Sequence, residues 1–149
     1  MGHLKITILA LLCSTPFLIY ATEQSPDIRD SVEARLLDCI KSNFSKSCWL
    51  QTFQGKIVPW LKEKEKPVLI EGEKHWQNWL DGRKVFDVYK VEAVEKAQIF
   101  DSRAYIVERD DGEVAGLVVG FRRATGNWYV SDLKSDNTKA FLDKIISIP

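Results

Sequence analysis

Alternating apolar residues in the C-terminal half constrain the fold of this chain more than any other feature. The alternation continues on both sides of a Thr125-Gly126 turn, through Leu117, Val119, Phe121, Trp128 and Val130. A repeat of two around a glycine turn is typical of an antiparallel hairpin with one buried face. We therefore expect the stretch from Val85 to Leu133 to form an antiparallel sheet.

Two more strands are expected before this hairpin, from Val85 to about Val94 and from Arg103 to Arg109. Turn-forming residues separate the strands, because Asp101-Ser102 stands between these two and Asp110-Asp111-Gly112 leads into the hairpin. The residues between Glu95 and Phe100 are compatible with an extension of either strand. The turn at Asp101-Ser102 is therefore the prediction that depends most on strand register.

Gly116 and Gly120 lie inside a predicted strand. Glycine within a strand marks a bulge or a bend. We therefore expect a curved sheet of about four strands.

An amphipathic helix precedes the sheet. Ser25-Pro26 is a typical helix start, with serine as the cap and proline in the first turn. Apolar residues then recur at steps of four and predict one buried face: Ile28, Val32, Leu36, Ile40 and Phe44, with Leu37 beside them. We interpret this stripe as part of the core.

Three shorter helices complete the expected fold. The first is capped by Ser45 or Ser47 and carries Trp49, Leu50 and Phe53, the second extends from Glu71 to Leu80, and the third is capped by Ser135 or Asn137 and carries Phe141, Leu142, Ile145 and Ile146. The charged segment from Lys62 to Pro67 is interpreted as a solvated helix end and loop. The sequence thus predicts an α+β fold, with N-terminal helices packed on the sheet and a short C-terminal helix.

The N-terminus is typical of a secretory signal peptide. A charged start from Met1 to Lys5 precedes an apolar stretch from Ile6 to Tyr20, and Ala21 is the small residue expected at a cleavage site. A membrane anchor is the alternative, but fifteen apolar residues that include Pro16 are short of the ~20 that span a bilayer. We expect residues 1–21 to be removed and residues 22–149 to form one periplasmic or secreted domain without a stable membrane anchor.

Cys39 and Cys48 are expected to form a disulfide, because Cys13 leaves with the leader and paired cysteines are usually bridged in oxidising compartments. A reactive thiol is the alternative, but no Cys-x-x-Cys motif or adjacent histidine supports it. A zinc site is disfavoured, because His75 is the sole histidine after the leader. No cofactor is expected either, because phosphate-binding glycine motifs are absent from the sequence.

The charge balance does not indicate nucleic-acid binding. The chain holds 21 basic and 21 acidic residues, and removal of the leader, which holds Lys5 and no acid, leaves 20 against 21. Proteins that bind nucleic acid nonspecifically need an excess of positive charge. A small ligand or another protein is therefore the expected partner.

Five residues are candidates for ligand binding: His75, Trp76, Trp79, Tyr105 and Asp132. Asp132 shares a strand face with Trp128 and Val130, so it points inward if that face is the core one. An inward carboxylate is either a general base with a raised pKa or a structural acceptor for backbone N–H groups. The two tryptophans either cover an open end of the sheet or form the rim of a binding site. No catalytic motif such as Gly-x-Ser-x-Gly is present.

The order of these features resembles the nuclear-transport-factor-two-like superfamily, the cystatin-like α+β cone. The resemblance depends on helices first, a Trp-rich short helix, and a bent sheet ending in the sequence from Gly126 to Leu133, as in small exported bacterial domains of unknown function. It implies a pocket inside the cone. Members include isomerases and dehydratases that use Asp, His or Tyr there, and many non-catalytic binding modules. No catalytic residue is carried over to this chain.

The main hypothesis is an exported, non-catalytic binding or accessory domain that acts through a cone pocket or a sheet face. One alternative is a cone-pocket isomerase or hydro-lyase with Asp132, Tyr105 and His75 as acid–base groups. Another is an immunity-type inhibitor of an exported toxin. A homodimer through the open sheet face is compatible with exposed arginines there, for which Arg103, Arg109 and Arg122 are the candidates.

Overall fold

The structure is a computed structural model that describes residues 27–91 and 93–147. The helices are α1 (Ile28–Lys41), α2 (Cys48–Phe53), the 3-10 helix η1 (Pro59–Lys64), α3 (Glu65–Leu80) and α4 (Lys139–Ile146). The strands are β1 (Val85–Lys90), β2 (Val94–Lys96), β3 (Phe100–Arg109), β4 (Val114–Ala124) and β5 (Asn127–Asp136). The predicted α+β fold is confirmed, whereas the predicted leader lies outside the described residues.

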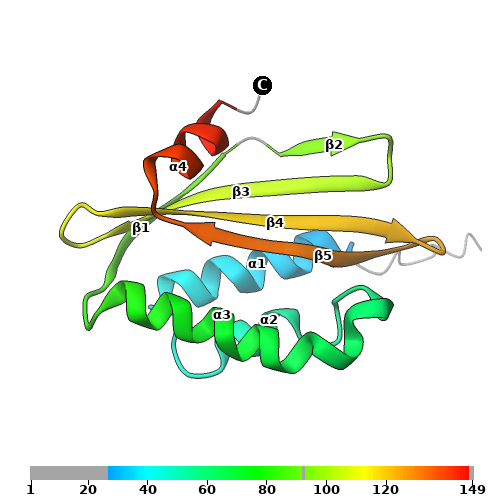
Figure 1. Cartoon of the computed structure of the whole chain (residues 1–149), viewed down its shortest axis with the longest axis horizontal. Helices are drawn as coiled ribbons and strands as arrows, with labels where there is room; N and C mark the ends of the chain where they lie inside the picture. The colour runs from blue at the N-terminus through cyan, green and yellow to red at the C-terminus, as the bar shows by residue number, and fades with distance from the viewer. Residues whose placement is uncertain (1–26, 92, 148–149) are drawn as a thin grey trace, which may run out of the picture.

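The strands form one antiparallel sheet in the order β1-β3-β4-β5, and β2 also pairs with β3. β1 pairs with the end of β3 that includes Arg109, and β2 pairs with its beginning at Phe100. The predicted strand from Val85 to Val94 is therefore two shorter strands along one edge of β3. Figure 1 shows α1, α2 and α3 on one face of this sheet and α4 on the other.

The turn predicted at Asp101-Ser102 is wrong. Both residues lie inside β3, and the chain reverses at Ala97 and Gln98, which adopt positive φ angles of 53° and 56°. Aspartate is common in turns, but the side chain of Asp101 is buried and pairs with Arg29 and Arg103. A polar contact in the interior thus produces a turn-like pattern within a strand.

The buried helix stripe is confirmed as far as Ile40, and Phe44 is buried from the loop that follows α1, where its φ is 50°. Val32, Leu36, Ile40 and Phe44 are fully buried, and they pack in one cluster with the inward residues of β4. The ring of Phe44 stacks on that of Trp76 from α3 at a centroid distance of 4.6 Å. Trp76 is fully buried and Trp128 is half-buried against the same cluster.

Several predicted helix ends differ from the structure. Asp27 caps α1 by accepting a hydrogen bond from the Arg29 amide at 2.9 Å, and the predicted cap Ser25 lies outside the described residues. α3 begins at Glu65, six residues before the predicted start at Glu71, so the charged segment is helical rather than a loop. Proline is tolerated in a first turn, where its missing N–H has no partner to lose.

Thr138, rather than Ser135 or Asn137, is the residue at the N-cap position of the last helix, and its side chain makes no capping hydrogen bond. The reason is that β5 continues to Asp136 and keeps Ser135 in the sheet. Ser47, one of two predicted caps, does precede α2, although its side chain makes no capping hydrogen bond.

A β-bulge in β5 reverses the expected orientation of Asp132. Phe121 of β4 pairs with Val130, whereas the preceding Gly120 pairs with Asp132, so Ser131 is an extra residue on β5. Beyond the bulge Leu133 faces the core and Asp132 faces the opposite side, where it is exposed. The inward carboxylate proposed from strand alternation is therefore wrong.

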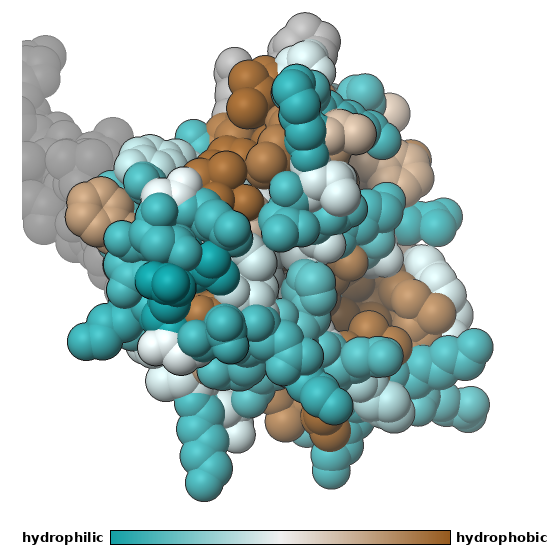
Figure 2. All heavy atoms as spheres, turned by 60° about the vertical axis from the view of Figure 1, so that its left-hand side comes forward, coloured by the Kyte–Doolittle hydropathy of each residue, from teal (hydrophilic) through white to brown (hydrophobic). Residues whose placement is uncertain are grey.

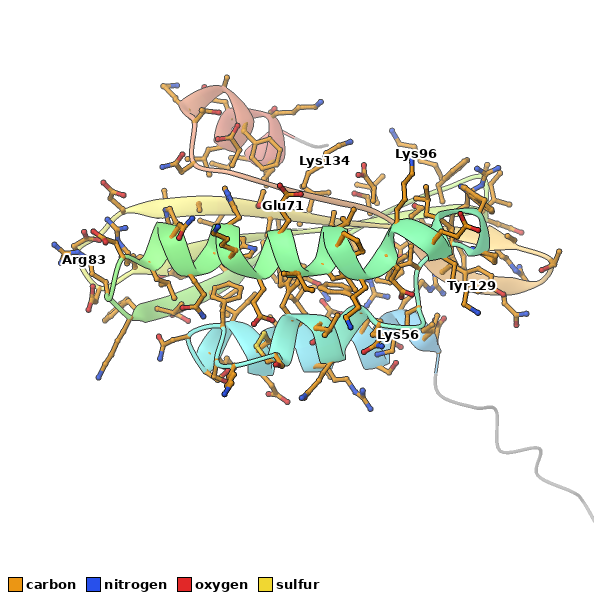
Figure 3. All side chains as sticks on the ribbon, turned by 60° about the horizontal axis from the view of Figure 1, so that its bottom comes forward. Lys56, Glu71, Arg83, Lys96, Tyr129 and Lys134 are labelled. Carbon is orange, nitrogen blue, oxygen red and sulfur yellow. A yellow bond between two sulfur atoms is a disulfide. The ribbon has the colours of Figure 1, made fainter. Side chains whose placement is uncertain are left out.

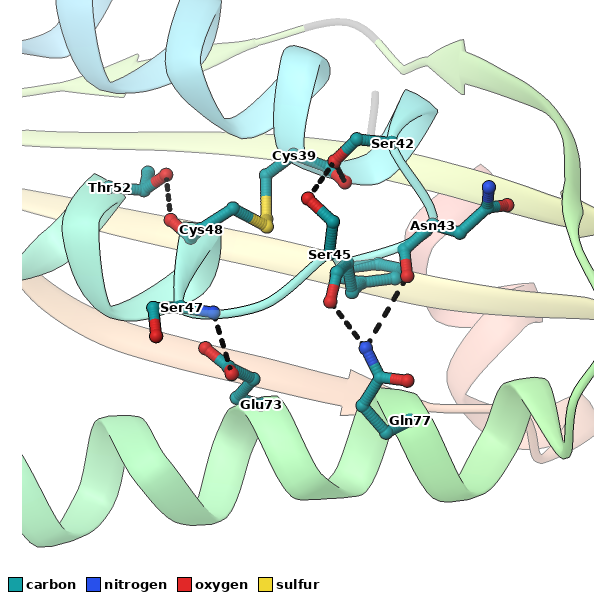
Figure 4. Close-up of a disulfide and its surroundings, with 10 residues drawn as sticks. Cys39, Ser42, Asn43, Ser45, Ser47, Cys48, Thr52, Glu73 and Gln77 are labelled. Atoms are coloured by element: carbon teal, nitrogen blue, oxygen red, sulfur yellow. Dashed lines mark hydrogen bonds between the residues drawn. A yellow bond between two sulfur atoms is a disulfide. The ribbon is translucent and has the colours of Figure 1, made fainter.

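The disulfide between Cys39 and Cys48 joins the end of α1 to the start of α2, with Cα atoms 5.4 Å apart. The connecting loop is also tied to α3, because Gln77 donates to the carbonyls of Asn43 and Phe44 (Figure 4). Glu73 accepts a hydrogen bond from the Ser47 amide at 3.1 Å. The bridge therefore belongs to a compact helical corner.

Gly116 of β4 allows α4 to pack on the outer face of the sheet. A Cβ atom at this position would overlap Ile145 Cδ1 and would lie 2.9 Å from Phe141 Cε1. A bulge or bend was expected at both glycines. Gly116 instead allows a close approach of α4 to the sheet, whereas Gly120 lies next to the bulge between β4 and β5.

We expect Gly116→Val to lower the free energy of unfolding by about 1 to 2 kcal/mol, because the added methyl groups overlap Ile145. Urea unfolding of the variant and of the wild type measures the loss. In an Ile145→Ala background the loss caused by Gly116→Val should be smaller, since the space is then available. Equal stability of Gly116→Val and wild type would show that α4 does not dock on this glycine.

Candidate functional site

A groove lies between α3 and the outer edge of β5. It consists of two adjoining hollows of about 470 and 210 Å³ that share Val68 and Leu133. Its apolar surface is formed by Trp49, Ile57, Leu61, Val68, Leu69, Leu117, Leu133 and Phe141. Its rim is charged, with Lys64, Glu65, Glu71, His75, Asp132, Lys134 and Asp136. In Figure 2, which turns the α3 and β5 side to the right, an apolar hollow is framed there by hydrophilic side chains.

The edge of β5 is covered at one end only. The Val130 amide donates to the Lys56 carbonyl at 2.8 Å, and the Val130 carbonyl accepts from the Val58 amide at 3.0 Å. Ile57 thereby forms a parallel bridge with Val130. Within residues 27–91 and 93–147, no backbone group pairs with the outer edge of β5 from Ser131 to Asp136.

Gly72 is the position on α3 where Trp49 packs directly against the helix at the wall of the groove. A Cβ atom at Gly72 would lie 2.8 Å from Nε1 of Trp49, so the missing side chain leaves room for the indole ring. Val68, one turn earlier, is 55% exposed at the same wall. The sequence marks Val68 only as an apolar residue directly after the charged segment from Lys62 to Pro67, and that position was its one signal.

The charged side chains of β5 lie on the face opposite the core. Lys134 Nζ and Asp132 Oδ2 are 2.5 Å apart, and both side chains are largely exposed. Asp136 follows on the same face and accepts a hydrogen bond from the Thr138 amide at 3.0 Å. Glu71 of α3 and Lys134 of β5 project next to each other at the rim of the groove (Figure 3).

A third hollow, of about 610 Å³, lies on the outer face of the sheet and also borders Asp132. The Arg122 guanidinium lies over the rings of Trp60 and Phe100, at 5.1 and 5.5 Å from their centroids. Trp60 is 58% exposed and Phe100 is 45% exposed. Arginine and aromatic residues are enriched among the residues that dominate protein–protein binding.

Arg122 is exposed as expected, but Arg103 and Arg109 are buried rather than on an open sheet face. Both lie at inward positions of β3. Arg109 pairs with Asp111 and lies over the ring of Trp79. These two arginines therefore do not contribute to an exposed surface for a homodimer.

Polar groups under α1 satisfy one another. Arg103 contacts Glu33 at 2.6 Å and Asp101 at 3.3 Å, and the Tyr105 hydroxyl donates to Glu33 at 2.7 Å. Burial and the hydrogen bond to Glu33 raise the pKa of Tyr105. Burial opposes ionisation of Glu33, but hydrogen bonds from Lys90 and Tyr105 outweigh it and keep the pKa of Glu33 below its usual value. These ion pairs attach α1 to β3. The hydroxyl proton of Tyr105 is engaged in the hydrogen bond to the Glu33 carboxylate.

The five candidate residues do not meet in one place. His75 and Asp132 lie on opposite walls of the groove, at its two ends. Trp76 is in the core, Trp79 is half-buried beside Arg109, and Tyr105 is buried under α1. None of the described hollows is lined by His75, Tyr105 and Asp132 together, which the cone-pocket enzyme hypothesis requires. As ligand-binding residues, all five remain predictions.

No family model, no curated protein and no solved structure matches this chain. The resemblance to the nuclear-transport-factor-two-like superfamily therefore stays a prediction. In the part of the chain that the structure describes, no group of three or more His, Cys, Asp or Glu side chains is placed to hold a metal ion. None of the described helices is long and apolar enough to cross a bilayer.

Proposed function

We propose that this chain is an exported, non-catalytic binding domain that takes a segment of another protein into the groove between α3 and β5. The observation that carries the proposal is the groove itself, with an apolar surface, a charged rim and an uncovered strand edge along one wall. Apolar concave surfaces with a few polar groups at their margin are typical binding sites.

Two further observations support binding rather than catalysis. The titratable groups under α1 are engaged in ion pairs with one another, so they hold the fold together. The exposed rings of Trp60 and Phe100 provide further apolar surface on the outer face of the sheet, and the Arg122 guanidinium lies over both rings. A protein partner fits this combination better than a small substrate, because the hollows are open and border two faces of one strand.

Photo-crosslinking tests the proposal in the organism that makes the protein. A photoreactive residue at Val68, in the groove, should join covalently to a partner protein identified by mass spectrometry. The same residue at Ala34, which is exposed on α1, should not give that product. Leu61→Glu should abolish the Val68 product, because it places a charge in the apolar groove while its own exposed position leaves the fold intact.

Three results would contradict the proposal: the same crosslinked partner from both positions, none from Val68, or a product that Leu61→Glu leaves unchanged. Turnover of a small substrate that is lost in Tyr105→Phe or His75→Gln would favour the enzyme alternative instead. The unfolding midpoint of each variant separates loss of binding from loss of folding.

A further inference from the structure

We propose that the segment bound in the groove is an extended peptide that adds as a strand to the free edge of β5, with residues in the order basic, apolar, acidic, apolar, basic. This inference rests on the proposed function and names the chemistry of the partner. Addition of a strand to an open sheet edge is a recurring mode of peptide recognition, in which the main chain supplies affinity and alternate side chains supply specificity.

The chain itself already uses this mode next to the groove. Lys56 and Val58 exchange main-chain hydrogen bonds with Val130, as a short parallel strand does. Past the bulge, β5 pairs regularly with β4 from Asp132 to Asp136. The free edge over these residues is therefore straight enough to receive another strand.

Alternation along β5 assigns the apolar positions of the peptide. Leu133 and Ser135 pair with Val119 and Leu117, so they face the core side of the sheet. Residues of an added strand opposite Leu133 and Ser135 point to the same side. There they contact the wall of the groove that includes Val68.

The opposite face of β5 assigns the charges. Asp132, Lys134 and Asp136 alternate on that face, so the residues across from them are expected to be basic, acidic and basic. This order reads the same in both directions. The prediction for the peptide therefore holds for a parallel and for an antiparallel strand.

A second copy of the chain fits this edge less well. If the regular stretch from Asp132 to Asp136 paired antiparallel with itself, each Asp132 would lie opposite an Asp136 and Lys134 would lie opposite its own copy. Like charges directly opposite each other destabilise a strand pair. Charge repulsion thus disfavours self-association in this full register, whereas a foreign segment can be complementary at all three charged positions.

Two synthetic peptides test the inference against the full exported chain. One has the core sequence Lys-Val-Glu-Val-Lys, and the other has the charges inverted as Glu-Val-Lys-Val-Glu. At low salt we expect the first peptide to bind about tenfold more tightly by calorimetric titration, because three cross-strand pairs are attractive rather than repulsive. The difference should shrink at high salt, where exposed charges are screened.

A matched protein variant should invert the preference. Asp132→Lys combined with Lys134→Glu reverses the exposed ion pair and leaves Asp136 to accept the hydrogen bond from the Thr138 amide before α4. The variant is expected to bind the charge-inverted peptide more tightly than the original one. N-methylation of one alternate set of peptide amides should abolish binding, while methylation of the other set should not, because only one set faces β5.

The remaining outcomes separate this inference from the proposed function. If both peptides bind equally and Val68→Glu weakens both, the groove binds peptides but β5 does not read their charge, and the inference is overturned. If neither peptide binds while the Val68 crosslink forms, strand addition is overturned and the groove function stands. A concentration-dependent dimer in light scattering that Leu61→Glu disrupts would show that a second copy occupies the groove, which also overturns the inference.

Discussion

Arg103→Met is expected to lower the free energy of unfolding by about 3 kcal/mol, because it removes the cation from a buried set of carboxylates. The Arg103 side chain is 10% exposed and pairs with Glu33, Asp101 and Asp30. Asp101 is 5% exposed, so it would remain in the interior with Arg29 alone beside it, at 3.3 Å. Glu33 and Asp101 would each lose one cation while they stay mostly buried, and a buried charge with too little compensation costs more than the pair contributes, which is why the loss is large.

Urea unfolding at neutral pH measures this loss, and Arg123→Met is the matched control on the same sheet. Arg123 is exposed, and among the residues that the structure describes its side chain makes only a long hydrogen bond, at 3.4 Å to the Gly126 carbonyl. Its replacement should change stability by no more than about 0.5 kcal/mol. Similar losses for the two variants would mean that the ion pairs under α1 do not hold the helix to the sheet.

Removal of the disulfide by the double substitution Cys39→Ala and Cys48→Ala is expected to cost about 2 to 3 kcal/mol. The bridge closes a loop with a sequence separation of 9, which restricts the unfolded chain. It also joins two helices whose cysteine side chains pack in or against the core. Urea unfolding with and without a thiol reductant measures the effect.

The reductant should lower the stability of the wild type to about that of the double variant, and it should leave the double variant unchanged. An unfolding midpoint of the wild type that does not respond to reductant would contradict the prediction. The chain-entropy argument sets the expected size, and any packing lost with the sulfur atoms adds to it.

Periodicity explains which parts of the fold could be predicted from the sequence. The buried face of α1 and the alternation of β4 were predictable because each repeats regularly over many residues. The start of α3 was not, because the residues from Lys62 to Pro67 have the composition of a loop and are held helical by the apolar residues that follow. Local composition thus predicted the wrong start for α3, because tertiary packing determines where this helix begins.

The candidate site shows the same division. His75 and Asp132 were identified from the sequence, and both line the groove. The groove itself was not predictable, because its walls come from α3 and β5, which lie far apart in the chain. Alternation placed Asp132 inward, since a single extra residue at Ser131 leaves the composition of the strand unchanged.

The bulge at Ser131 also makes the length of this strand matter more than its composition. Deletion of that one residue would join Val130 directly to Asp132, so regular alternation would still direct Asp132 to solvent and Leu133 to the core. If Ser131 stayed and paired without a bulge, Leu133 would turn toward solvent and the carboxylate of Asp132 would enter the hydrophobic interior. Many substitutions on the exposed side would leave the sheet intact. A residue added between Ser131 and Leu133 that the bulge does not absorb would exchange the wet and dry surfaces of the rest of the strand, so the number of residues there matters more than their chemical nature.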